Sequence, residues 1–312
     1  MSVKLRNERL VVTLATIPSR ISRIRTVIES IKAQTRQPDR IYVCICKFCE
    51  WEQSSYEVPK WLADDADVQL VVSQRDYGPA NKLLSMLHEE PDPATRIVIV
   101  DDDWSYNPDM LEVLEERFEH YQRSAVGSSG ARLPRDWSVM ETRIGPEIHA
   151  TPIMRHHLVF IAESPEDLAV DILQFGFGTM VLREWFNDDI YDLVQPLEPL
   201  FFSDDVMFSG YLESRGVERV CVSGIPLPRL LDHWNVRPLH GEGRSTGNYK
   251  VAIPEIASRL NIWPPERLFD PPRPPALSVL RYWGLRAIRK TYRVAVMPLL
   301  QRAGLPVGRE RK

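Results

Sequence analysis

The sequence predicts an α/β protein built on a doubly wound, mostly parallel sheet with helices on both faces. Near-continuous apolar runs at 10–16, 40–46 and 96–100 are typical of strands that are buried on both sides. A stripe of Ile and Val at three- and four-residue spacing over 21–31 predicts an amphipathic helix. Strands that alternate with helices over the first ~120 residues are typical of a parallel sheet.

The remaining elements follow in order along the chain. We expect a strand at 68–72, a helix at 81–88 and a helix that begins at 204. After residue 125 glycine and proline interrupt the apolar runs, which predicts a smaller, irregular second half. The expected organisation is one domain with two halves, a proline-rich linker and a tail, at residues 1–125, 126–263, 264–275 and 276–312.

Composition excludes several classes of protein. The chain has 312 residues, of which 44% are hydrophobic and 26% charged, so it is neither disordered nor collagen-like. A formal net charge of −4 argues against nucleic acid as a partner. The tail is basic and amphipathic, and its segment 276–300 predicts a helix lying on an anionic membrane surface. A helix packed on the body or on a protein partner is the alternative.

The cysteines and the first apolar run indicate the cellular compartment of the protein. Three of the cysteines are crowded at Cys44, Cys46 and Cys49 and the fourth is Cys221, which is not the pattern of a disulfide framework and favours a reducing compartment. Cys44 and Cys46 lie in an apolar run, so we interpret the cluster as small apolar side chains rather than a metal site. The run at 10–15 is too short for a signal peptide, and no segment approaches the ~20 apolar residues of a spanning helix. The predicted location is cytoplasmic, with peripheral binding to the inner face of the cell membrane.

Three consecutive aspartates, Asp101, Asp102 and Asp103, end the strand at 96–100. Adjacent carboxylates repel one another, so a bound cation would favour their ionised forms. In an extended segment Asp101 and Asp103 would lie on one side and Asp102 on the other. Mg²⁺ and Mn²⁺ use few protein ligands and share the rest with phosphates and water. The motif predicts a divalent cation, with a solvated acidic turn as the alternative.

A second acidic pair, Asp204 and Asp205, lies about a hundred residues further on. Ser203 could cap the helix that begins there, and one of the two aspartates could act as a general base. Between the two acidic motifs, Gly176 and Gly178 would let the backbone approach a bulky ligand closely. These segments predict a site assembled from several parts of the chain.

The segment after the third predicted strand adds an aspartate and a lysine. Asp76 and Lys82 lie where this strand passes into a helix. In doubly wound sheets, ligands bind beyond the carboxyl ends of the strands. Lys82 could therefore pair with a phosphate, or it could simply occupy the start of the helix.

Five segments in this order carry a family resemblance: Thr16-Ile17-Pro18-Ser19-Arg20, Asp76-Tyr77-Gly78-Pro79-Ala80-Asn81-Lys82, Asp101-Asp102-Asp103, Phe175-Gly176-Phe177-Gly178 and Ser203-Asp204-Asp205. Over about residues 10–235 the chain resembles bacterial glycosyltransferases of the GT-A fold, family-2-like type. The resemblance implies a GT-A-like sheet, a nucleotide-diphosphate sugar donor, and a glycan or lipid-linked acceptor. It also implies Mn²⁺ or Mg²⁺ held by a DxD motif on the diphosphate. The sugar is not identified.

The resemblance also implies roles for individual residues. Asp101 and Asp103 would be the DxD pair, and Asp205 matches the general base better than Asp204 does. These enzymes often supply a late histidine to the metal, for which His233 is the candidate and His240 the second choice. Residues of the donor pocket would be Thr16, Arg20, Asp76, Lys82, Asp101 and Asp102, and those of the sugar or acceptor side Gly176, Phe177 and Gly178.

Three other functions share part of this pattern. A glycoside hydrolase also uses two carboxylates, but it needs no metal cluster at a strand end. A nucleotidyltransferase shares the metal and nucleotide sites without needing the later base. A binding module on a degenerate fold, docked to the membrane by its tail, would have no turnover. The sequence favours a metal-dependent, inverting glycosyltransferase that acts on a cell-surface glycan or its lipid-linked precursor.

Overall fold

The computed structural model describes residues 8–122, 124–133, 159–162, 166–194, 199–236, 244–264 and 267–268. All of these residues belong to one compact unit, which takes in residues 1–150 and 156–269. The tail 276–312, most of the linker and His240 lie outside the described residues. The membrane-binding helix and the boundaries between the predicted parts stay predictions.

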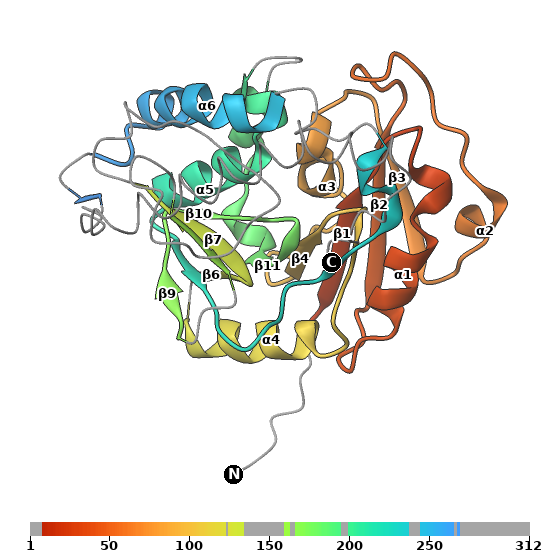
Figure 1. Ribbon diagram of the computed structural model, residues 1–312, viewed down its shortest axis with the longest axis horizontal. Coiled ribbons are helices and arrows are strands. Elements are labelled where there is room, and N and C mark those ends of the chain that lie inside the picture. Colours follow the sequence, from red (N-terminus) through yellow and green to blue (C-terminus); the bar gives the residue numbers. More distant parts are fainter. Residues whose placement is uncertain are drawn as a thin grey trace, which may run out of the picture. The chain divides into compact units, whose positions relative to one another are not determined.

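The described residues form an eight-stranded mixed sheet with helices packed against it, which confirms the predicted α/β class (Figure 1). The first four strands in spatial order pair in parallel, as the buried apolar runs predict. In spatial order the strands are β3 (Val68–Ser73), β2 (Arg40–Cys46), β1 (Leu10–Ala15), β4 (Arg96–Val100), β11 (Phe177–Leu182), β6 (Ser124–Gly127), β12 (Glu218–Cys221) and β9 (Leu168–Ala169).

The second half of the sheet is mixed. β11 runs antiparallel to both β4 and β6, whereas β12 is parallel to β6. The sequence did not predict β11 as a strand, because its Gly178 interrupts the apolar run. In the structure Gly178 has φ of 99°. Two smaller sheets complete the fold, one made of β10 (Ile172–Leu173), β7 (Ser129–Arg132) and β8 (Val159–Ala162), the other of β13 (Arg229–Leu230) and β5 (Trp104–Ser105).

Helices cover the sheet, and in Figure 1 α4 and α5 lie on opposite sides of β6 and β11, with α6 beyond α5. The predicted helix at 21–31 is a 3₁₀ turn followed by α1, and the one at 81–88 is shorter than expected, because Met86 N–H bonds to the carbonyl three residues back rather than four. The α-helices are α1 (Arg25–Lys32), α2 (Lys60–Ala63), α3 (Asn81–Leu84), α4 (Met110–His120), α5 (Asp204–Ser214) and α6 (Arg244–Leu260).

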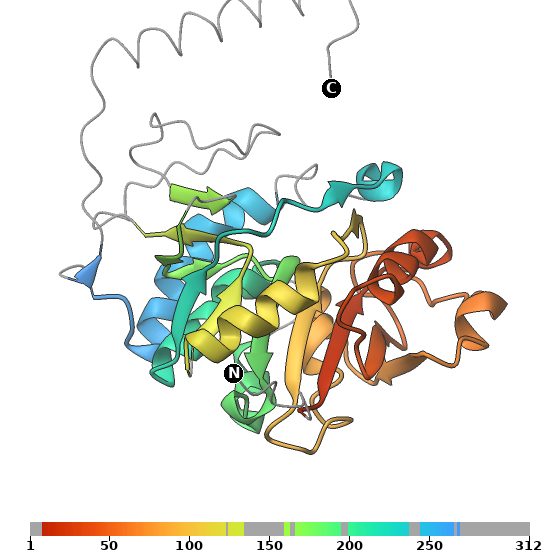
Figure 2. The ribbon, with the colours of Figure 1, turned by 90° about the horizontal axis from the view of Figure 1, so that it is seen from below.

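Short 3₁₀ helices link these elements: η1 (Ile21–Arg23), η2 (Gly78–Ala80), η4 (Arg183–Trp185), η5 (Asp188–Leu193), η6 (Pro199–Phe202) and η7 (Asp232–Asn235). Figure 2 shows the segment from β12 to η7 crossing the molecule toward β5 and the start of α1. This crossing is fixed by the pairing of β13 with β5. It brings residues 229–236 to the end of β4.

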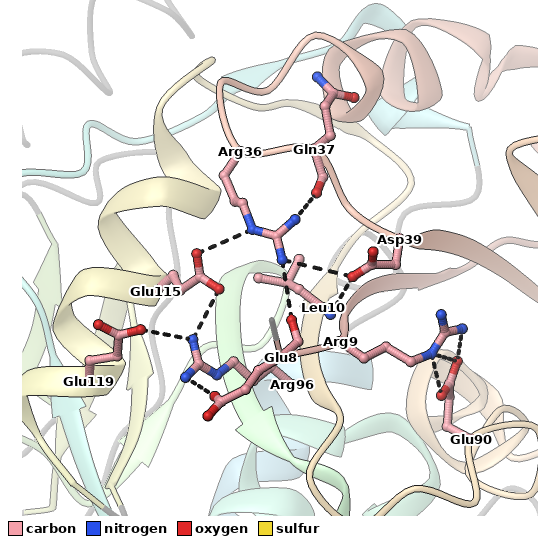
Figure 3. Close-up of polar contacts among 10 residues, drawn as sticks. All are labelled: Glu8, Arg9, Leu10, Arg36, Gln37, Asp39, Glu90, Arg96, Glu115 and Glu119. Carbon is pink, nitrogen blue, oxygen red and sulfur yellow. Dashed lines mark hydrogen bonds and ion pairs between the residues drawn. The ribbon is translucent and has the colours of Figure 1, made fainter. Parts of the chain in front are cut away.

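A buried ion-pair network closes the amino-terminal ends of the strands (Figure 3). Glu115 of α4 is fully buried and accepts hydrogen bonds from Arg96 at 3.0 Å and from Arg36 at 3.2 Å. Arg9 binds both carboxylate oxygens of Glu90. This network lies at the edge of the sheet opposite to the acidic motifs. In the described part of the chain, no helix has the length and apolar character needed to cross a membrane.

Candidate functional site

The predicted site residues converge at the carboxyl edge of the parallel strands. Thr16 follows β1, Asp76 lies three residues after β3, and Asp101 follows β4 directly. Because these strands are parallel, the segments that follow them leave the sheet at the same edge. The site therefore lies where doubly wound folds bind their ligands.

Arg20 organises one side of this edge. Its guanidinium group forms ion pairs with Asp102 at 2.8 Å and with Asp103 at 3.2 Å. The Thr16 hydroxyl donates to the second oxygen of Asp102 at 2.6 Å, and Arg20 Nε donates to the carbonyl of Val236 at 2.8 Å. Arg20 and Asp102 are both buried. The first motif and the aspartate triplet therefore form one connected polar cluster.

The predicted alternation within the aspartate triplet is wrong. Asp102 does not point away from Asp103, because both carboxylates bind Arg20. Asp101 instead binds Lys82 at 2.6 Å. The physical reason is that β4 ends at Val100 and the chain turns at the following aspartates, so the two-residue period of a strand no longer applies.

Lys82 connects the two acidic motifs. Its ammonium group lies 2.6 Å from Asp101 Oδ1 and 2.7 Å from Asp204 Oδ2. The side chain is 4% exposed. Burial lowers the pKa of Lys82, but the charges of Asp101 and Asp204 outweigh this effect and hold the pKa above its ordinary value. Lys82 is therefore a permanent cation between two carboxylates.

Asp205 has a different environment from Asp204. Its Oδ1 accepts a hydrogen bond from Phe175 N–H at 2.8 Å, and its Oδ2 accepts one from the Tyr249 hydroxyl at 2.7 Å. Burial and the charge of Asp204 raise the pKa of Asp205 to about 7. The residue as a whole is half-buried. A carboxylate with a pKa near neutrality is suited to accept a proton at physiological pH.

The start of α5 matches the prediction, but its cap does not. α5 begins at Asp204, and both aspartates lie in its first turn, where the helix dipole favours negative charge. Ser203 occupies the cap position without capping, and its buried hydroxyl has no hydrogen-bond partner in the described part of the chain. The two aspartates, rather than the serine, provide the polar groups at this helix end.

The glycines of the 175–178 segment pack against the protein itself. A Cβ atom on Gly176 would lie 1.9 Å from Asp101 Oδ2. Its carbonyl accepts hydrogen bonds from Asp101 N–H at 3.2 Å and from the Tyr106 hydroxyl at 2.6 Å. Gly178 lies against Met110, and the buried ring of Phe177 lies 4.9 Å from that of Trp104. A role for these residues toward a sugar or acceptor stays a prediction.

Asp76 holds a loop together. One of its oxygens accepts from Glu50 N–H at 2.8 Å, and the other accepts from Gly78 N–H at 2.7 Å and from Asn81 at 2.8 Å. Asp76 is buried. Its carboxylate therefore fixes the entry into η2 and α3, which places Lys82.

His233 lies beside the aspartate triplet. Leu231 N–H binds the carbonyl of Asp103 at 2.9 Å, and His233 Nε2 lies 2.7 Å from the carbonyl of Asp102. Since a carbonyl only accepts, Nε2 carries the proton of this hydrogen bond, and in the neutral ring Nδ1 keeps its lone pair. His233 is buried. The late histidine named by the resemblance is thus next to the DxD segment.

The residues present fit a divalent cation that takes few protein ligands. Asp103 Oδ1 is buried and has no hydrogen-bond partner among the described residues. Burial and the charges of Asp102 and Asp101 raise the pKa of Asp103 to about 8, which shows uncompensated negative charge. With all four carboxyl groups ionised, the aspartates paired with Arg20 and Lys82 would carry two negative charges in excess, the charge that one divalent cation balances.

The protein supplies few ligands for a metal ion at this position. Among the described residues, no three His, Cys, Asp or Glu side chains are grouped so that they could hold a metal ion. A cation at Asp103 would therefore take most of its ligands from phosphate and water, which is typical of Mg²⁺. All four cysteines are buried with free thiols.

Comparisons with known proteins do not assign a family. No model of a known protein family matches the sequence, and no curated protein matches it.

Sequence reasoning missed three tyrosines of the site. Tyr106 joins Asp101 to Gly176, Tyr249 binds Asp205, and Tyr56 donates to the carbonyl of Thr16 at 2.9 Å. Tyr106 lies three residues after the aspartate triplet, but nothing in its sequence neighbours marks it as polar and buried. Tyr249 lies 44 residues from Asp205, and only the packing of α6 brings them together.

Proposed function

We propose that the protein is a metal-dependent glycosyltransferase that moves a sugar from a nucleotide-diphosphate sugar to a hydroxyl group of a glycan or lipid-linked acceptor. The observation that carries this proposal is the bridge made by Lys82, which joins Asp101 of the strand-end motif to Asp204, the neighbour of Asp205. A cation-binding motif and a carboxylate with a pKa near neutrality thus share one sheet edge. The resemblance of the motif order to GT-A glycosyltransferases supports the same function.

Asp103 and Asp101, with His233 beside them, would hold Mn²⁺ or Mg²⁺. When bound, the metal stabilises the negative charge that develops on the leaving nucleoside diphosphate. The residues of the chain bind and orient the donor: Arg20 and Thr16 hold Asp102 on the nucleotide side, and Lys82 forms an ion pair with Asp101. Rigid positioning of donor and acceptor lowers the entropic part of the barrier.

Asp205 would act as the catalytic base. The acceptor O–H bond breaks and its proton passes to Asp205, while the acceptor oxygen forms a bond to the anomeric carbon. The bond from that carbon to the diphosphate oxygen breaks, and its electron pair leaves with the nucleoside diphosphate. A single displacement of this kind inverts the anomeric configuration and needs no second carboxylic acid.

A thermal-shift screen tests donor and metal binding together. UDP-glucose, GDP-mannose and dTDP-glucose are added with and without Mn²⁺, because a ligand that binds the native state raises its apparent stability. We expect one nucleotide to raise the melting temperature only with Mn²⁺, and Asp103→Ala to lose that rise. Asp64→Ala, at the exposed aspartate that ends helix α2, is the matched control and should keep the rise. A shift of equal size in Asp103→Ala would contradict the assigned metal site.

The products of donor hydrolysis separate the competing functions. A glycosyltransferase without acceptor releases nucleoside diphosphate slowly in a metal-dependent reaction, whereas pyrophosphate would indicate a nucleotidyltransferase. Tight donor binding with no turnover in the presence of Mn²⁺ would favour a binding module. The membrane contact is tested separately, because removal of residues 273–312 is expected to abolish binding to anionic liposomes and to leave nucleotide binding intact.

A further inference from the structure

Helix α6 completes the side of the site that contains Asp205. α6 packs on α5, and the two helices approach closely at Gly210, where an added Cβ atom would lie 2.8 Å from Ile256 Cγ1. Ile253 and Ile256 are buried in this interface. Tyr249 lies on the same helix and is also buried. Its hydroxyl group is therefore held in place by the packing of α6.

Two donors from different parts of the chain fix the Asp205 carboxylate. The backbone N–H of Phe175 donates to Oδ1 at 2.8 Å, and the Tyr249 hydroxyl donates to Oδ2 at 2.7 Å. One donor on each oxygen determines the plane of the carboxylate. Each oxygen keeps a second lone pair, so the group can still accept a proton from a substrate.

We propose that Tyr249 is a positioning residue for Asp205, whose hydroxyl group holds the carboxylate in one orientation and in its ionised form. This inference rests on the proposed function of Asp205 as the base. Tyr249 does not exchange a proton in the reaction. Burial and the charge of Asp205 hold the pKa of Tyr249 well above its ordinary value, so its hydroxyl remains a donor over the working pH range.

The groups around Asp205 have opposite effects on its pKa. Burial and Asp204 raise the pKa of Asp205, whereas Lys82, Phe175 N–H and Tyr249 lower it. Burial and the charge of Asp204 have the larger effect, so the pKa of Asp205 lies near neutrality. Loss of one hydrogen bond to a charged group is worth about one pKa unit or more, so removal of the Tyr249 hydroxyl should raise the pKa of Asp205 by that amount.

Tyr249→Phe tests this inference, because it keeps the ring and removes the hydroxyl group. The titration of Asp205 is followed by ¹³C NMR of aspartate side-chain carboxyls in the full-length protein, with its signal assigned by its absence in Asp205→Asn. We expect Tyr249→Phe to raise the pKa of Asp205 by about one unit or more. An unchanged titration would overturn the inference. This measurement needs neither donor nor acceptor.

Turnover provides the second readout. With the nucleotide sugar that stabilises the protein in the thermal-shift screen, Tyr249→Phe is expected to move the acid limb of the kcat profile to higher pH by the same amount. The KM for the donor should not change, and kcat should recover at high pH. A uniform loss at every pH would indicate a merely structural role and would overturn the inference.

The matched control is Tyr211→Phe. Tyr211 is a buried tyrosine of α5 whose hydroxyl binds Asp189 and Asn187 N–H rather than Asp205. Its loss should lower stability without moving the titration of Asp205 or the pH profile. If Asp205→Asn keeps wild-type turnover, the proposed base is wrong and the inference falls with it. If Asp205→Asn is inactive but Tyr249→Phe titrates like the wild type, the inference alone fails.

Discussion

The carboxylate of Asp101 occupies the space that a side chain on residue 176 would need. An added Cβ atom on Gly176 would lie 1.9 Å from Asp101 Oδ2, far inside van der Waals contact. The two residues are also joined through their backbones, since Asp101 N–H donates to the Gly176 carbonyl at 3.2 Å. Glycine at 176 thus allows Asp101 to reach Lys82, and it explains the close approach of β11 to the end of β4.

Gly176→Ala should therefore displace Asp101. We expect a loss of about 1–3 kcal/mol in the free energy of unfolding, the usual cost of overpacking, and a loss of metal-dependent nucleotide binding. Urea unfolding and the thermal-shift screen measure the two effects. In the Asp101→Ala background the same glycine substitution should cost clearly less, because the clashing carboxylate is gone. If Gly176→Ala lowers the free energy of unfolding equally in both backgrounds, the contact with Asp101 is not the reason that residue 176 must be glycine.

Lys82→Met should be strongly destabilising. It leaves the buried carboxylate of Asp204 without its cation, and breaking a buried ion pair in this way costs about 3–5 kcal/mol. The Asp101 side chain is 40% exposed, so the loss of its pair adds less. Adding Asp204→Asn should recover part of the loss. Lys32→Met is the control, because Lys32 pairs with Asp65 nearer the surface, where such pairs contribute about 1 kcal/mol or less. Similar losses in the two lysine variants, measured by urea unfolding, would contradict the bridging role.

The ionisation of Asp205 should make stability depend on pH. Its pKa is raised from the ordinary 3.8 to about 7, so between these values the native state holds a proton that the unfolded state has released. The contribution of Asp205 to stability is then present at pH 4 and lost as the pH rises through 7. Asn cannot ionise, so the free energy of unfolding of Asp205→Asn should not fall in this way. Relative to the wild type it should increase by on the order of 1–3 kcal/mol between pH 5 and pH 8.

Urea unfolding at pH 5, 6, 7 and 8 measures this difference. Asp64→Asn, at an exposed position, serves as the control and should show a constant difference from the wild type. A difference for Asp205→Asn that stays constant or shrinks as the pH rises would mean that the pKa of the carboxyl group is not raised in the native state.

The ion-pair network at the opposite edge of the sheet should affect stability without affecting the site. Glu115→Gln leaves Arg96 and Arg36 with a neutral partner in a buried position, and we expect a loss of roughly 3 kcal/mol (Figure 3). Nucleotide-induced thermal shifts should keep their size, because Glu115 lies far from the carboxyl edge. Lys60→Gln, in an exposed pair with Asp64, should be nearly neutral. A lost nucleotide shift in Glu115→Gln would show that the two edges are coupled.

The sequence predicted the first half of the sheet, and the convergence of candidate residues at one of its edges, because both depend on local patterns. Strands such as β1 and β4 are buried on both faces, so their apolar runs are visible without knowing their neighbours. Parallel strands end at one edge, and polar residues that follow them therefore converge there, as Thr16 and Asp101 do. The first turn of α5 was also evident from Asp204 and Asp205.

Tertiary packing decided which side chains meet within the site. The turn after Val100 gives Asp102 and Asp103 the same partner, Arg20, where a strand period predicts opposite sides. Pairing of β13 with β5 brings His233 beside the aspartates, and packing of α6 on α5 brings Tyr249 to Asp205. These contacts join segments that lie 44 to 131 residues apart. No short-range periodicity encodes them, because they depend on the close fit of whole elements that form one core.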